Sequence, residues 1–203
     1  MGSRLTALAV ALLVLAGCSD GDGDDAAGTS AGGAPDKATA STDGPAPTVG
    51  DEGPVEPVQP PEDTLTVAAE GIVCAVPQTW EMDGPTDDDG IVQVSARGRL
   101  PGDLPATVQV VSVETSRSTA ERWTEEARTI GEVTDEWTFT LPTLSTNGPI
   151  TLLDVENTGE EVRGWLLIFE HADGRTYNVT LTSPADDFDE RHAAVILGTV
   201  RDA

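Results

Sequence analysis

Residues 161–171 read Glu-Val-Arg-Gly-Trp-Leu-Leu-Ile-Phe-Glu-His, and the stretch from Trp165 to Phe169 is apolar without interruption. Successive side chains of a β-strand point to opposite faces of its sheet, so an unbroken apolar run buries both faces. The segment therefore predicts a central strand in a sheet that is covered on both sides.

Strand and turn signals continue on both sides of this segment. Asp173-Gly174 predicts a hairpin turn, and Thr176–Thr182 follows it as a strand that alternates apolar and polar residues. Before the central run, strands are predicted from Trp137 and over Ile150–Val155. Shorter strands are expected over 64–68, 72–75, 91–96 and 107–113, with an acidic loop over 83–90.

Two helices complete the predicted domain. Apolar residues recur at helical spacing between residues 120 and 130, and Gly131 can end that helix. Pro184 and the acidic residues after it favour the start of a second helix, with Val195 and Ile196 among the residues on its inner face. The predicted fold class is α+β: an antiparallel sheet of roughly six or seven strands with an internal and a C-terminal helix.

The beginning of the chain has the pattern of a secretory signal. Arg4 gives it a basic start, and the run Leu5–Ala16 is apolar except for Thr6. This run is shorter than the roughly 20 residues that a membrane-spanning helix needs. It closes with the sequence Leu15-Ala16-Gly17-Cys18.

This Leu-Ala-Gly-Cys ending resembles the lipobox of bacterial lipoproteins. The resemblance implies signal cleavage between Gly17 and Cys18, and attachment of a diacylglycerol, with chains such as palmitate, to the Cys18 sulfur. Two acyl chains hold a protein stably on a membrane. Residues 1–17 would then be the signal peptide, and the mature chain would sit on the extracytoplasmic face of the cell membrane. The alternative is an ordinary signal peptide that happens to contain a cysteine.

Residues 18–63 have the composition of a tether. They are rich in Gly, Pro and acidic residues, and their branched aliphatic residues are Val49, Val55 and Val58. So little apolar surface cannot offset the entropy lost on folding, which predicts a disordered acidic spacer after the lipidated cysteine. Every Trp, Tyr and Phe of the chain lies in residues 64–203, which we therefore predict to be the globular domain.

Composition restricts the chemistry of this domain. The chain has 36 acidic and 11 basic side chains and a formal net charge of -25, which argues against nucleic-acid partners. Its two histidines and two cysteines are too few for a dense metal site or a disulfide framework. We expect no cofactor, no metal and no catalytic residues. Cys74 lies among apolar residues and is expected to be a buried, unreactive thiol.

The domain also carries a family resemblance. Its motifs are Val76-Pro77-Gln78-Thr79-Trp80, the hairpin from Leu166 to Leu181, and the final helix from Phe188. With the order of the elements, they resemble the PsbP-like fold, in particular the LpqN-type lipoproteins of actinobacteria, although that family often has Gly where this chain has Thr79. The resemblance implies an α/β/α sandwich over residues 64–203 that serves as a non-enzymatic binding or accessory module.

Together these features predict a lipid-anchored, non-enzymatic binding or accessory module of the cell envelope. Its expected partners are the membrane, through the lipid on Cys18, and an envelope protein or an amphipathic small molecule. Trp80, at a corner beside the acidic segment, is the candidate ligand contact, with packing in the core as the favoured alternative. Two alternatives stay open: an envelope hydrolase that uses a pair of carboxylates, and a structural or interaction domain without a pocket.

Overall fold

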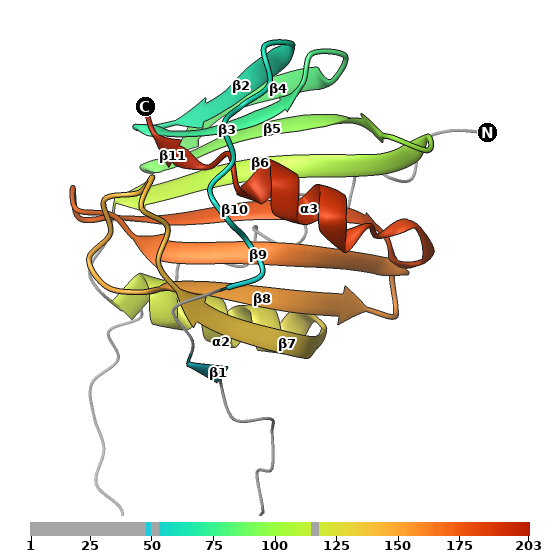
Figure 1. Ribbon diagram of the computed structural model, residues 1–203. Helices are drawn as coiled ribbons and strands as arrows, with labels where there is room; N and C mark the ends of the chain where they lie inside the picture. Colours follow the sequence, from blue (N-terminus) through green and yellow to red (C-terminus); the bar gives the residue numbers. More distant parts are fainter. Residues whose placement is uncertain (1–47, 50–52, 115–117) are drawn as a thin grey trace, which may run out of the picture.

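The computed structural model describes residues 48–49, 53–114 and 118–203, which form two β-sheets and two α-helices (Figure 1). The α+β class is as predicted. The signal segment, with Gly17 and Cys18, and most of the predicted tether lie outside the described residues. No helix in the described ranges combines the length and the apolar character needed to cross a bilayer.

The large sheet has the strand order β1-β7-β8-β9-β10-β6-β5-β4, in which β1 runs parallel to β7 and the other pairs are antiparallel. Its strands are β1 (Thr48–Val49), β4 (Glu81–Asp88), β5 (Ile91–Leu100), β6 (Leu104–Glu114), β7 (Glu132–Phe139), β8 (Ile150–Asn157), β9 (Val162–Glu170) and β10 (Arg175–Pro184). The small sheet has the order β11-β3-β2, formed by β2 (Thr64–Ala69), β3 (Ile72–Pro77) and β11 (Arg201–Asp202). The helices are α2 (Ser118–Ile130), the short 3₁₀ turn η3 (Ala185–Asp187) and α3 (Glu190–Leu197).

The central strand predicted from the apolar run is β9, which lies between β8 and β10. Trp165, Leu167 and Phe169 pack into the larger apolar cluster on one face of the sheet. Leu166 and Ile168 belong to a second cluster on the opposite face. Both faces of β9 are therefore buried, as the sequence predicts.

Different elements cover the two faces of the large sheet. On one face α2 packs over β7, β8 and β9 through Trp123 and Ala127. The small sheet and α3 cover the other face, in front of the large sheet in Figure 1, while α2 lies behind it. The sequence predicted one sheet, but β2 and β3 form a layer of their own. The reason is that β3 is buried from Ile72 to Val76, packed against both β6 and α3.

The segment predicted as an acidic loop, 83–90, is mostly strand, because β4 pairs with β5 from Glu81 to Asp88. This strand is the edge of the large sheet, and all of its residues are exposed. Main-chain hydrogen bonds hold it to the sheet. Because none of its side chains is buried, it lacks the alternating apolar pattern by which strands are recognised in a sequence. Its carboxylates and Pro85 are residues typical of an edge strand.

The C-terminal helix forms, but its inner face differs from the prediction. The buried residues of α3 are Ala193, Ile196 and Leu197, whereas Val195 is 42% exposed. The prediction continued the same helical spacing from Phe188 to Val200, as if one unbroken helix covered this range. The real helix is shorter, because it begins after its cap at Asp189 and ends at Leu197.

Residues 53–63, assigned to the tether, instead pack on the domain as a strap. In Figure 1 this segment crosses the face of the large sheet that carries α3. Val55 is 3% exposed within the larger apolar cluster, and the backbone N–H of Val58 donates to the carbonyl of Gly198 at 2.8 Å. The boundary predicted at residue 64 is therefore wrong, because one buried valine is too weak a signal to detect in a polar segment.

We expect Val55→Ala to lower the free energy of unfolding by about 1–3 kcal/mol, because the side chain is buried in the main core. Urea unfolding of the full chain measures this change. Glu56→Ala, at the exposed neighbouring position, is the matched control and should change stability by less than about 0.5 kcal/mol. Equal effects of the two substitutions would show that the strap does not contribute to the fold.

A second prediction concerns the cap of α3. The Asp189 carboxylate accepts a hydrogen bond from the backbone N–H of His192 at 3.0 Å, and this bond lowers the pKa of Asp189. Its stabilising effect is therefore complete above the unfolded-state pKa of about 3.9 and is lost as the pH falls through the lower folded-state value. Asp189→Ala should cost about 1 kcal/mol at pH 7, and the cost should shrink below about pH 4. Thermal unfolding across pH measures it, with exposed Asp186→Ala as the control; a cost that does not change with pH would contradict the role of the charge.

Candidate functional site

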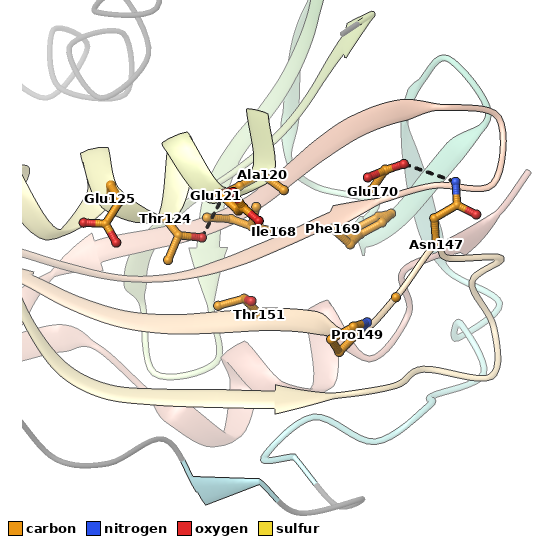
Figure 2. Close-up of a pocket in the computed structure, with 11 residues that line it drawn as sticks. Ala120, Glu121, Thr124, Glu125, Asn147, Pro149, Thr151, Ile168, Phe169 and Glu170 are labelled. Carbon is orange, nitrogen blue, oxygen red and sulfur yellow. Dashed lines mark hydrogen bonds between the residues drawn. The ribbon is translucent and has the colours of Figure 1, made fainter. Parts of the chain in front are cut away.

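A groove of about 340 Å³ lies between α2 and the large sheet (Figure 2). One wall is the first half of α2, and the other is formed by the turn before β8 and the end of β9. The lining residues are Ala120, Glu121, Thr124, Glu125, Asn147, Gly148, Pro149, Thr151, Ile168, Phe169 and Glu170. We call this feature the α2 groove.

The apolar face of α2 determines how its wall is placed. Trp123 and Ala127 are 5% and 2% exposed and pack on Leu153, Leu166 and other apolar residues of the sheet. With these residues directed at the sheet, Glu121 and Glu125 fall one turn apart on the exposed flank of the helix. Figure 2 shows both side chains on the helix wall of the groove.

The opposite wall is organised by Asn147. Its backbone N–H donates to the carbonyl of Glu170 at 2.8 Å, and its side-chain Nδ2 donates to the Glu170 carboxylate at 3.2 Å. The same Nδ2 also donates to the carbonyl of His171 at 3.1 Å. Gly148, with φ of +116°, supplies the backbone conformation that the turn needs. The carboxylate of Glu170 is thereby held at the end of β9, facing the groove.

The groove is anionic with an apolar floor. Its lining includes three glutamates, while none of the lining residues is a lysine, arginine or histidine. Glu125 forms an ion pair with Arg128, which is outside the lining. Ile168, 2% exposed, is buried beneath the groove, and Ala120 and Pro149 present apolar atoms at its margins. Such a site attracts a cationic group and disfavours anions.

The structure places Trp80, the predicted ligand contact, in the core. Its ring is 3% exposed and lies against Gly98, where any Cβ would overlap the indole. Its Nε1–H donates to the carbonyl of Arg99 at 3.1 Å. The ring and its N–H are both engaged within the fold, which favours core packing, the alternative to a ligand contact, for Trp80.

Cys74 is buried as expected and is not a nucleophile. Burial raises the pKa of its thiol to about 12, an effect larger than the opposing hydrogen bond with Thr199. Its Sγ lies 3.6 Å from the carbonyl of Ile196 and 3.7 Å from the Thr199 hydroxyl. A thiol that stays protonated at neutral pH cannot attack a substrate.

A serine, a histidine and an aspartate also meet beside β11, but not as a catalytic triad. Ser145 Oγ donates to the Asp202 carboxylate at 2.6 Å, and His171 Nε2 lies 3.2 Å from the same carboxylate. A triad requires the histidine to contact the serine hydroxyl directly, whereas here both residues contact the aspartate. His171 also lies 3.0 Å from Asp173, so the cluster joins the β9–β10 hairpin to the C-terminus.

A second charge cluster, centred on Arg163, links α3 to the large sheet. Asp154, 1% exposed, accepts two hydrogen bonds from Arg163, at 2.9 Å and 2.5 Å. Arg163 also donates to Glu190 of α3 at 2.6 Å, and its guanidinium lies 4.8 Å from the centre of the Phe188 ring. Its charge is thus used within the fold. Among the described residues, no group of three or more His, Cys, Asp or Glu is arranged to hold a metal ion.

The sequence matches no protein-family model and no curated protein. The case for the α2 groove therefore rests on its geometry. Glu121 and Glu125 could have been noticed as carboxylates one turn apart on a predicted helix. Their meeting with Asn147 and Glu170 depends on the bridge between Thr146 and His171, a pairing that no local pattern reveals.

The buried thiol gives a test of the described core. In a full chain with Cys18→Ala, Cys74 is the remaining cysteine. At pH 8 we expect it to react with a thiol reagent about a thousandfold more slowly than a free cysteine, because almost none of it is thiolate. Denaturing urea should restore the ordinary rate, which absorbance measures. Fast labelling without urea would contradict the burial of β3.

Proposed function

We propose that this protein is a lipid-anchored, extracytoplasmic binding module of the cell envelope without enzymatic activity, and that the α2 groove is its binding site. The acyl chains on Cys18 hold it at the outer face of the cell membrane. The groove binds a small molecule or a partner from the envelope. The observation that carries this proposal is a concave site with an apolar floor and carboxylates on both walls.

The groove supports a binding module over a pocketless spacer. A volume of about 340 Å³ is within the range of small-molecule sites. Three described residues that could supply nucleophilic catalysis are used within the fold. Cys74 is buried, and Ser145 and His171 are both directed at Asp202.

The layers of the domain support the PsbP-like part of the proposal. One helix, α2, covers one face of the large sheet, and α3 covers the other together with the small sheet. This order agrees with the α/β/α sandwich that the family resemblance implies. The hairpin of β9 and β10 and the final helix are both present at the positions that carried the resemblance.

The anchor is tested by Cys18→Ala. The native protein should fractionate with membranes, and mass spectrometry should show a cleaved chain that begins with a diacylated Cys18. The variant should lose the lipid and the cleavage at Gly17, because the thiol that carries the diacylglycerol is absent.

Cys74→Ala is the matched control, since it removes the buried cysteine of the domain and should leave processing and fractionation unchanged. If Cys18→Ala is cleaved at the same bond and stays with the membranes, the lipoprotein proposal is wrong.

A further inference from the structure

The arrangement of charge in the α2 groove identifies a class of ligand. We propose that the groove binds a short aliphatic diamine or polyamine, with an ammonium group at each end and the methylene chain on the apolar floor. This inference rests on the proposed function for its site and adds the chemistry of the ligand. It follows from the positions of three carboxylates and one apolar side chain.

The carboxylates lie toward the two ends of the groove. Figure 2 shows Glu121 and Glu125 on α2 toward one end and Glu170, beside Asn147, at the other, with Ile168 and Phe169 between them. Ile168 and Glu170 share a face of β9 two residues apart, which separates their Cα atoms by about 7 Å. An ion with a single compact charge would contact one end only, whereas a diamine can reach both.

The apolar floor favours methylene groups between the charges. Ile168 is buried beneath the groove, and Pro149 and Ala120 add apolar atoms at its margins. A fully hydrated metal ion gains nothing from this surface, whereas a methylene chain binds more tightly with each CH₂ group that it buries. The lining thus offers carboxylates for the two ammonium groups of a diamine and apolar atoms for its methylene chain.

Calorimetric titration of the full-length chain in a nonionic detergent tests the inference, with 1,5-diaminopentane as the probe and pentylamine as its single-charge control. We expect saturable binding of the diamine and about tenfold weaker binding of pentylamine, because pentylamine has no second ammonium group for the carboxylate at the other end of the groove. Equal affinities for the two amines would overturn the two-ended site.

Matched variants separate the groove from the general negative charge of the protein. The double variant Glu121→Gln, Glu170→Gln should weaken diamine binding by about tenfold or more. The double variant Asp87→Asn, Asp88→Asn removes the same charge from the exposed strand β4 and should change binding by less than about twofold. If both pairs weaken binding equally, the diamine is only a counter-ion and the inference is wrong.

Two further outcomes are informative. Glu121→Gln alone leaves the hydrogen bond between Asn147 and Glu170 intact, so weaker binding by this variant cannot come from a loosened turn. Tighter, groove-dependent binding of a tetralysine peptide would overturn the small-molecule inference in favour of a basic protein segment. If the diamine does not bind, the proposal of a lipid anchor on Cys18 is unaffected. If Cys18→Ala behaves like the native protein, the calorimetric test of the groove is still valid.

Discussion

The burial of β9 on both faces is the constraint that organises the domain. Two apolar faces must both be removed from water, and the long helix α2 can cover only one of them. On the other face α3 runs only from Glu190 to Leu197, too short to cover a sheet of this width. The chain completes that cover with the small sheet and with the strap that carries Val55. The second sheet and the packed strap are therefore consequences of the apolar run at Trp165–Phe169.

The same domain must also accommodate a large excess of carboxylates. Two of its arginines contact two acidic groups each: Arg163 binds Asp154 and Glu190, and Arg128 binds Glu125 and Glu136. Only the pair with Asp154 is deeply buried, and there the second hydrogen bond and the Phe188 ring offset part of the desolvation cost. The exposed pairs contribute little to stability. Acidic side chains outnumber basic ones by 36 to 11, so most carboxylates cannot be neutralised by a basic side chain of the same chain. These carboxylates can contribute to the binding of a ligand or a partner.

The sequence predicted those parts of the fold that have a local pattern. The central strand, its hairpin at Asp173-Gly174 and the helix that packs through Trp123 all follow from periodicity or from turn residues. The missed parts depend on contacts between distant segments. β4 has no buried face, and Val55 is a single apolar residue whose contacts are made by the folded core. The sequence could not decide between a core position and a ligand contact for Trp80, because a tryptophan at a turn has the same sequence pattern whether its ring is buried or exposed. The groove was missed because its second wall forms only when the turn at Asn147 pairs with the end of β9.

Two acidic surfaces of the domain, β4 and the α2 groove, differ in what they can recognise. The carboxylates of β4 lie on an exposed edge, surrounded by water and mobile ions, where their attraction for a cation is screened and does not depend on its shape. Those of the α2 groove stand on two walls around a hollow that also presents apolar atoms, so a cation bound there can make apolar contacts at the same time. Selectivity requires such a combination, because charge alone attracts every cation and apolar surface alone attracts every hydrophobe. The position of the groove links this selectivity to the fold, since both α2 and Glu170 are placed by the packing of β9.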